Sequence, residues 1–374
     1  MSEEKVSPRR KKELRVTLIM PALNEEGTAK ETLDSVFGQS RLPDEIVVAD
    51  GCSTDGTVSV VESYRGRGVP LEVVKNEKVV VPAGRNLAIE RASHEVIAAA
   101  DFGTILDRRW LEELVGPLER DPSVDAVAGT TRPRVSTRFE KTVAAVVYGS
   151  RFDPDRLTPE ELAQIIPEKI LFSGNSVAFR KEVWRRAGGF PEWILWGEDR
   201  FFARKLHHIG ARVVGAVGAV AHTELRSTLT GLFRQFYFYS KGNAQTGWIS
   251  TNVYRLGLRY LFLVLLLAGG FFYTALWYLS ALGLTARIYR SGVKRYRDVH
   301  RKFPDWRSLL WIPVILFAHD AAVLAGHLSG VCDWWVDPFY RRRARAYVAE
   351  EPGNEAAVEG DSSPRHGKPR VRRA

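Results

Sequence analysis

Polar and acidic side chains follow the first two apolar runs of this 374-residue chain, at the points where buried strands would end. Val16–Met20 leads into Pro21–Glu26 (PALNEE), and the next run ends at Asp50 before Gly51–Thr57 (GCSTDGT). A carboxylate such as Asp50 can accept a base N–H or a ribose hydroxyl, and glycines let a ligand approach the backbone. Each turn alone is typical of a helix cap, but as consecutive strand ends they predict a nucleotide-binding edge.

Short apolar runs alternate with stretches of helical spacing in the N-terminal third of the chain. The runs are Val16–Met20, Glu45–Ala49, Leu71–Val74 and Val96–Ala100, and the helical stretches are Glu25–Phe37, Thr57–Tyr64, Gly84–Ala92 and Arg108–Leu118. This alternation predicts an α/β fold with a doubly wound, mostly parallel sheet. Ligands of such sheets bind beyond the carboxyl ends of the strands, where both polar turns lie.

The two turns resemble the opening of the family 2 glycosyltransferases, which have the GT-A fold. That family has a proline–small–Asn–Glu turn and then an Asp-Gly-Ser-Thr-Asp-Gly-Thr turn, into which this chain inserts Cys52. Further strings typical of the family follow in its order: Gly84-Arg85-Asn86, Asp101, Ser173-Gly174-Asn175, Gly188-Gly189-Phe190 and Glu198-Asp199. The similarity implies a GT-A-like catalytic domain over residues 15–245.

The resemblance also implies which residues bind the donor. Ala22, Asn24, Glu25 and Asp50 would line the nucleoside pocket, and Arg85 would lie near the base or the diphosphate. A cation facing a diphosphate is favourable on charge alone.

A divalent metal, Mg²⁺ or Mn²⁺, is the implied cofactor. In the family, an Asp-any-Asp motif that starts at the position of Asp101 holds the metal against the donor diphosphate, and oxygen ligands suit these hard cations. This chain reads Asp101-Phe102-Gly103, so the second carboxylate is missing. His222 lies where some related transferases have a late histidine ligand, although a structural histidine is the alternative.

Asp199 is the implied catalytic base. Sugar transfer with inversion needs a group that takes the proton of the acceptor hydroxyl as its oxygen attacks the anomeric carbon. The resemblance assigns this role to the aspartate of the Glu198-Asp199 pair. A carboxylate that opens a helical stretch can instead be a plain cap.

The net charge of +10 is concentrated beside apolar segments and at the two ends of the chain. Basic clusters in such places indicate anionic membrane lipid or solvated flanks, and we expect no nucleic-acid partner because no recognisable binding module accompanies them. The polar residues 1–14 and the basic residues 341–374 are expected to be disordered. No secretory signal is visible, so a cytoplasmic catalytic domain at the cell membrane is expected.

Residues 246–340 are expected to form a membrane-associated region with two apolar helices, 260–284 and 309–332. The first carries no charge over 25 residues, while the second includes Asp320. If both cross the membrane, the basic stretch 285–308 lies outside, against the positive-inside tendency. Segments that enter and return, interfacial helices and plain core helices remain alternatives. The aromatic stretch Leu229–Tyr239 is either an interfacial helix or a core helix.

The function implied is transfer of a sugar, with inversion, from a nucleotide-sugar donor to a lipid-linked or saccharide acceptor during synthesis of a cell-surface glycan or exopolysaccharide. A polyprenyl-phosphate sugar synthase is the alternative within the same class. A catalytically weak nucleotide-sugar-binding membrane scaffold is the alternative from another class, and the incomplete metal motif is its only support.

Overall fold

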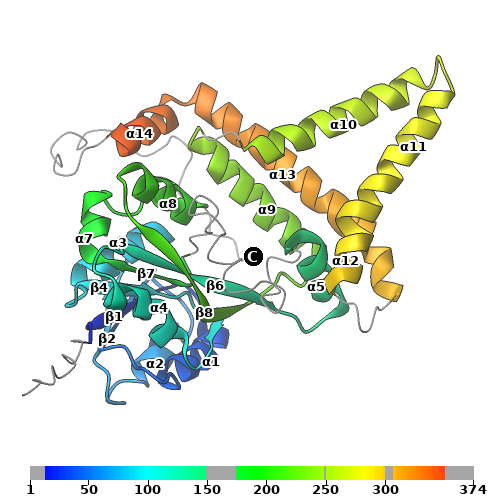
Figure 1. Cartoon of the computed structure of the whole chain (residues 1–374). Coiled ribbons are helices and arrows are strands. Elements are labelled where there is room, and N and C mark those ends of the chain that lie inside the picture. Colours follow the sequence, from blue (N-terminus) through cyan, green and yellow to red (C-terminus); the bar gives the residue numbers. More distant parts are fainter. Residues whose placement is uncertain (1–12, 149–173, 248–249, 300–305, 350–374) are drawn as a thin grey trace, which may run out of the picture.

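The computed structural model describes residues 13–148, 174–247, 250–299 and 306–349 (Figure 1). Its sheet has eight strands in the order β3-β2-β1-β4-β7-β6-β8-β5. The strands are β1 (Val16–Ala22), β2 (Glu45–Asp50), β3 (Leu71–Lys75), β4 (Val96–Ala99), β5 (Thr104–Leu106), β6 (Ala126–Arg134), β7 (Val177–Arg180) and β8 (Val213–Glu224). Strands β1 to β4 pair in parallel, whereas β7 is antiparallel to both β4 and β6. The predicted α/β sheet is confirmed, parallel at its N-terminal end and mixed beyond β4.

Helices cover both faces of the sheet because its strands are apolar on both sides. Along β1, Leu18 packs into the core beneath α1 and α4, while Ile19 packs on the opposite side beneath α3 and α8. The helices of this sheet domain are α1 (Glu26–Phe37), α2 (Thr57–Glu62), α3 (Val81–Arg91), α4 (Trp110–Arg120), α7 (Lys181–Arg186) and α8 (Glu198–His208). This double cover leaves the carboxyl ends of β1, β2 and β4 as the edge where polar residues gather.

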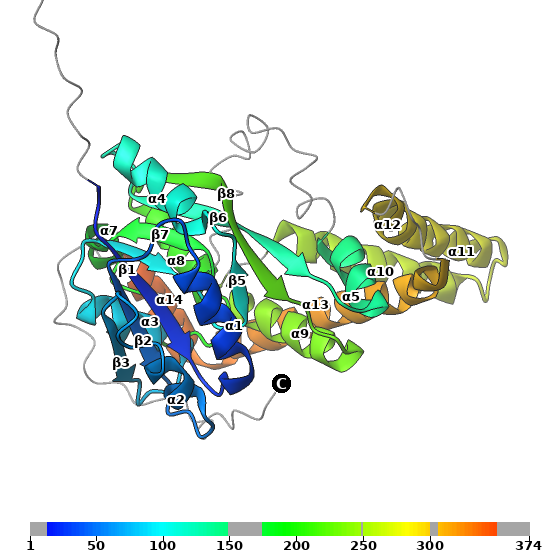
Figure 2. The ribbon, with the colours of Figure 1, turned by 90° about the horizontal axis from the view of Figure 1, so that it is seen from below.

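Most of the remaining helices extend from one side of the sheet domain, whereas the last one lies against α8 (Figures 1 and 2). They are α5 (Arg138–Val143), α9 (Leu229–Gln245), α10 (Thr251–Gly269), α11 (Ala275–Ile288), α12 (Lys294–Val299), α13 (Trp311–Val336) and α14 (Pro338–Ala349). Short π-helical turns, Ala144–Tyr148 and Tyr289–Val293, follow α5 and α11, and a 3₁₀ turn, Trp306–Leu310, precedes α13. Among the described residues, two helical segments, Thr251–Gly269 and Trp306–Val336, are long and apolar enough to cross a membrane by length and composition.

Two expectations about this region were wrong. The segment 260–284 is not one helix, because the chain breaks after Gly269 and restarts as α11 at Ala275. Residues 341–349 are not disordered, because they belong to α14, which returns to the sheet domain. There Tyr347 is buried and its hydroxyl donates to the carbonyl of Gly189 at 2.6 Å, which anchors the helix. The stretches 1–12 and 350–374 lie outside the described residues.

Candidate active site

The two polar turns predicted to bind a nucleotide lie side by side. Ala22 at the end of β1 is in register with Asp50 at the end of β2, and the amide of Gly51 donates to the carbonyl of Ala22 at 2.8 Å. The carboxylate of Asp50 accepts the amide of Ser53 at 3.1 Å, so part of its capacity is used in shaping its own turn. Parallel pairing therefore brings these predicted nucleoside-binding residues to one edge.

Asn24 joins the first turn to the second. Its side-chain oxygen accepts the amide of Thr54 at 2.8 Å, and its own amide donates to the hydroxyl of Ser53 at 2.9 Å. Asn24 has φ +56° and the inserted Cys52 has φ +62°, so both lie in the left-handed region. Asparagine tolerates that region better than most residues. The asparagine thus has a structural role that the sequence pattern alone did not reveal.

Glu25 links the turns to the next acidic residue. Its carboxylate accepts the hydroxyl of Thr28 at 2.6 Å. Burial raises the pKa of Glu25, and the negative charge of Asp101 raises it further, while Arg226 opposes the shift. The carboxylates of Glu25 and Asp101 therefore share one electrostatic environment, at the ends of β1 and β4.

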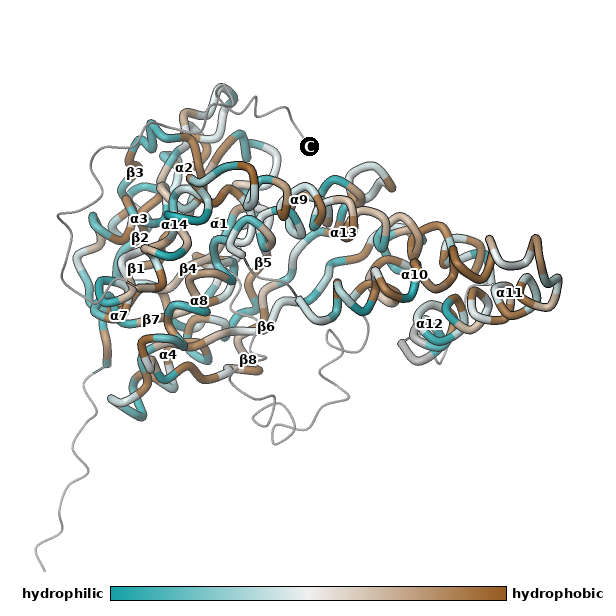
Figure 3. The backbone as a smooth tube through the Cα atoms, turned by 90° about the horizontal axis from the view of Figure 1, so that it is seen from above, coloured by the Kyte–Doolittle hydropathy of each residue, from teal (hydrophilic) through white to brown (hydrophobic). Residues whose placement is uncertain are grey.

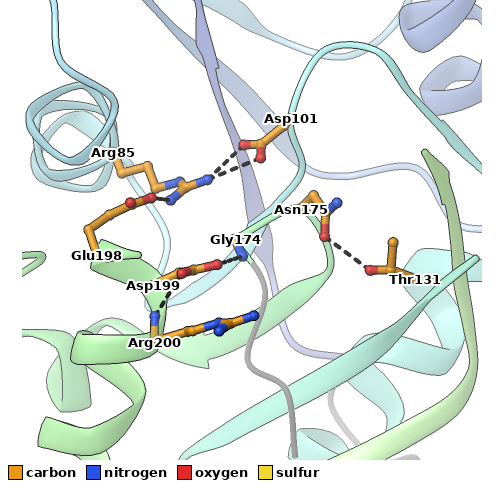
Figure 4. A network of polar contacts seen from close by, with 8 residues as sticks. All are labelled: Arg85, Asp101, Thr131, Gly174, Asn175, Glu198, Asp199 and Arg200. Atoms are coloured by element: carbon orange, nitrogen blue, oxygen red, sulfur yellow. Dashed lines mark hydrogen bonds and ion pairs between the residues drawn. The ribbon is translucent and has the colours of Figure 1, made fainter. Parts of the chain in front are cut away.

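Arg85 on α3 bridges two carboxylates (Figure 4). Its Nη2 donates to both oxygens of Asp101 at 2.9 and 3.1 Å, and its Nη1 donates to Glu198 at 2.5 Å. The arginine side chain is only 3% exposed, whereas that of Asp101 is 36% exposed. The predicted contact of Arg85 with a donor base or diphosphate stays a prediction. In the structure, the guanidinium of Arg85 fixes the position of the Asp101 carboxylate.

The charges in this bridge are strongly coupled. Burial alone would disfavour the guanidinium, but Asp101 and Glu198 together raise the pKa of Arg85. Burial raises the pKa of Glu198, Arg85 opposes this shift, and the neighbouring Asp199 adds to it. One buried cation thus holds two carboxylates of the site in a fixed geometry, which is costly to disturb.

Asp199 differs from its buried neighbour Glu198. It is half-buried at the start of α8, where Gly197 has φ +83°. Its carboxylate accepts the amide of Gly174 at 3.2 Å and the amide of Arg200 at 2.7 Å (Figure 4). These two backbone donors orient the carboxylate at the start of the helix. The adjacent acids therefore have separate positions: Glu198 points to Arg85, and Asp199 stays accessible.

Gly174 is required by close packing against the bridge. A Cβ at this position would lie 2.2 Å from Nη2 of Arg85, so no side chain fits without displacing the guanidinium. The next residue, Asn175, accepts the hydroxyl of Thr131 at 3.1 Å through its side-chain oxygen. Ser173, the first residue of this string, lies outside the described residues.

The proposed metal ligands are placed less completely. His222 lies on β8 in register with Ile105 of β5, and its Nε2 is 2.9 Å from the carboxylate of Asp107. Within the described part of the chain, no group of three or more His, Cys, Asp or Glu side chains could hold a metal ion by itself. Asp101 offers partly exposed carboxylate oxygens, which fit a hard cation only if the donor diphosphate and water supply the other ligands. The metal roles of Asp101 and His222 stay predictions.

An α/β sheet with acidic turns at the carboxyl edge of its parallel strands is the architecture of the GT-A glycosyltransferases. The mannosyltransferase PcManGT from Pyrobaculum calidifontis, solved in complex with GDP-Man and Mn²⁺, has this fold. The two structures superpose with a TM-score of 0.51 at 23% identity, over 88% of this chain and 90% of that chain. At this identity, the similarity shows a shared fold.

Residues 17–186 match the family described as Glycosyl transferase family 2, so this chain contains a family 2 glycosyltransferase domain. The O-antigen chain rhamnosyltransferase RfbN of Salmonella typhimurium is 24% identical over 249 residues, 64% of this chain and 76% of that protein. The poly-beta-1,6-N-acetyl-D-glucosamine synthase of Staphylococcus epidermidis is 23% identical over 281 residues, 73% of this chain and 66% of that protein. The predicted family and the GT-A-like fold are confirmed for this domain, and the family supports a glycosyltransferase enzyme.

Proposed function

We propose that this glycosyltransferase transfers a sugar from a nucleotide-sugar donor to an acceptor hydroxyl by a single displacement that inverts the anomeric carbon, in assembly of a cell-surface glycan. The observation that carries the proposal is the division between the two adjacent acids. Arg85 holds Glu198 and Asp101, and Asp199 is left open beside them.

Donor binding would use the joined turns at the ends of β1 and β2. Asp50, Asn24 and Glu25 lie at this edge. Asp101, held in place by Arg85, would be a ligand of a divalent cation. When bound, Mg²⁺ or Mn²⁺ would neutralise negative charge on the departing nucleoside diphosphate.

Asp199 would act as the base. The acceptor oxygen forms a bond to the anomeric carbon as the bond from that carbon to the diphosphate oxygen breaks. The hydroxyl proton passes to the carboxylate of Asp199, and the nucleoside diphosphate leaves with the bonding electron pair. Two backbone amides orient this carboxylate, so it is positioned before the acceptor arrives. No covalent enzyme intermediate is needed.

A lipid-linked acceptor is supported by what surrounds Asp199. Trp196, three residues before it, stacks on Phe238 of α9 with ring centroids 5.4 Å apart. The other side of α9 contacts α13, where Ser240 donates to the carbonyl of Val323 at 2.7 Å. The aromatic stretch therefore lies between the site and the apolar C-terminal helices. A saccharide carried by a membrane lipid would arrive from that side.

The test is a transfer assay with Asp199→Asn. Nucleoside diphosphate release is measured across a panel of nucleotide-sugars with Mn²⁺ or Mg²⁺ and a membrane lipid extract. Loss of the base should lower the rate about 10²–10⁴-fold, while a thermal shift shows that the donor still binds. Asp121→Asn, at an exposed carboxylate paired with Arg212, is the matched control and should keep its rate.

Three results would redirect the proposal. A product with the same anomeric configuration as the donor contradicts inversion. A polyprenyl-monophosphate sugar as the product identifies the synthase alternative. Donor binding by the wild-type protein with no turnover under any of these conditions supports the scaffold alternative.

A further inference from the structure

Helices α10 and α11 form an apolar hairpin that the rest of the protein does not cover. No charged residue occurs from Tyr260 to Ala286. The side chains at the end of the hairpin are nearly bare: Phe271 is 81% exposed, Phe272 84% and Tyr273 73%. Figure 3 shows the hydrophobic colouring of both helices along their projecting length. Exposed apolar surface on this scale is typical of a lipid or protein contact.

The chain reverses direction at the end of this hairpin. After Gly269, the amides of Phe272 and Tyr273 both donate to the Gly269 carbonyl at 2.9 Å, which closes a tight turn. The indole of Trp277 on α11 then donates to the carbonyl of Leu267 on α10 at 3.0 Å. Helix α10 therefore runs away from the sheet domain, and α11 runs back toward it. The turn after Gly269 is the closed end of the hairpin, and the opposite end is the open end.

The depth of the hairpin is less than the thickness of a membrane. Ten residues of α10, Tyr260 to Gly269, separate Arg259 from the turn. At about 1.5 Å per residue this is ~15 Å, and the twelve residues from Ala275 to Ala286 give ~18 Å. The hydrocarbon core of a bilayer is about 30 Å thick. The uncharged part of the hairpin can thus reach about the middle of a bilayer and no further.

Cations surround the open end of the hairpin. Exposed basic side chains are Arg255 and Arg259 on α10, Arg290 in the turn after α11, and Lys294 and Arg297 on α12. Basic residues beside an apolar insertion are attracted to anionic headgroups by about 1 kcal/mol each. The charge and the apolar depth therefore fit the same partner, the near leaflet of an anionic membrane.

The open end is also attached to α13. Asp320 of α13 is buried, pairs with Arg287 of α11, and accepts the hydroxyl of Tyr260 on α10 at 2.8 Å. One carboxylate thus fixes both arms at the same level. An ion pair at this position also marks where the apolar part of each arm ends.

Helix α13 packs closely against α9. A Cβ at Gly326 would lie 2.1 Å from the carbonyl oxygen of Tyr237, and one at Gly330 would lie 2.3 Å from that of Lys241. These glycines let α13 and α9 pack with their backbones in contact. The amino group of Lys241 also pairs with Asp333 at 3.0 Å.

We propose that the α10–α11 hairpin enters an anionic bilayer from the side of the catalytic domain and returns to the same side without crossing. The basic residues after α11 then stay on the catalytic side, and the conflict with the positive-inside tendency disappears. This inference does not depend on the donor, the metal or the acceptor.

Cysteine accessibility tests the path of the chain. Full-length Arg255→Cys, Arg290→Cys and Phe272→Cys proteins are treated with a membrane-impermeant maleimide in sealed vesicles whose catalytic domain faces outward. Peptide mapping separates the new cysteines from Cys52 and Cys332. Positions 255 and 290 should both react in sealed vesicles, and position 272 only after detergent. Protection of position 290 until the vesicles are opened means a crossing helix, and reaction of position 272 without detergent means a hairpin in water. Either result overturns the proposal.

Vesicle flotation tests the lipid chemistry. Replacing Arg255, Arg259 and Arg290 by glutamine should weaken binding to phosphatidylglycerol vesicles about 5-fold per charge, or roughly 100-fold in total. The control replaces Arg65, Arg91 and Arg185 of the sheet domain by glutamine and makes the same change in net charge. Equal losses in the two variants, or equal wild-type binding to neutral and anionic vesicles, would contradict the proposal.

Discussion

The sheet domain and the α10–α11 hairpin are both rich in apolar residues, but the sheet domain buries them and the hairpin leaves most of them exposed. The sheet buries its apolar side chains on both faces and also buries a cation between two carboxylates. Only 6% of the most apolar stretch of α10 is buried by the rest of the protein, against 33% of that in the segment that contains α13. Similar hydrophobic composition therefore accompanies different degrees of burial in the two helices. What separates α13 from α10 is a set of glycines that admits the backbone of a neighbouring helix.

The comparison predicts that substitutions cost most where charge is buried in the sheet domain. Arg85→Lys shortens the bridge and replaces a two-way guanidinium by an ammonium group, which cannot hold Asp101 and Glu198 in the same way. We expect a loss of about 3–5 kcal/mol in the free energy of unfolding, measured by denaturant titration. Arg91→Lys on the same helix is the control, because Arg91 is exposed and its ion pair with Glu72 is long, at 3.8 Å. A similar small loss in both variants would show that the buried bridge is not structurally important.

Next in size is the contact between α13 and α9. Gly326→Ala places a methyl group 2.1 Å from a backbone carbonyl, so the two helices must separate. Overpacking of this kind costs about 1–3 kcal/mol and should lower the Tm measured in detergent.

Gly283→Ala in α11 provides the opposite case. Nothing lies within 4 Å of the added methyl group, and alanine is favoured over glycine in a helix by about 0.8–1 kcal/mol. Its Tm should stay equal or rise slightly. If Gly283→Ala destabilised the protein as much as Gly326→Ala, the two helices would not differ in their burial.

The smallest effect expected is a dependence of stability on pH. Because burial raises the pKa of Glu198 above the ordinary carboxyl value of 4.5, the folded state keeps a proton that the unfolded state releases. The contribution of Glu198 to stability is therefore present in acid and is lost as the pH rises from 4.5 through the folded-state pKa. Glu198→Gln should remove this loss, so the difference in Tm between the two proteins should change across that range. Parallel Tm profiles would contradict the shift.

Much of the catalytic sheet could be predicted from the sequence, because buried parallel strands are short apolar runs. The expected runs Val16–Met20 and Val96–Ala100 correspond to β1 and β4 with differences of at most two residues at the ends. The joining of the two polar turns also follows from parallel pairing. The bridge through Arg85 did not follow, since no local pattern shows that Arg85 meets Glu198, which is 113 residues away.

The C-terminal helices were less predictable, since hydropathy records composition and not direction. Gly269 and Gly270 lie at the break between α10 and α11. The continuous apolar composition around them nevertheless predicted a single helix. In α14, Ala344 and Tyr347 occupy one side of a basic stretch that composition alone suggested to be disordered. In both segments, the positions of a few residues decide the structure, and the average composition does not show them.

Helix α9 has a consequence for the size of the acceptor. It touches Trp196, three residues before Asp199, on one side and α13 on the other. With the hairpin seated in lipid, this rigid spacer would hold the active site at a constant height above the headgroups. A glycan that grows away from its anchor would carry its reactive end past that height after a few additions. The height of the active site above the membrane would then limit the length of acceptor that the enzyme can extend, so that it acts at one stage of chain growth.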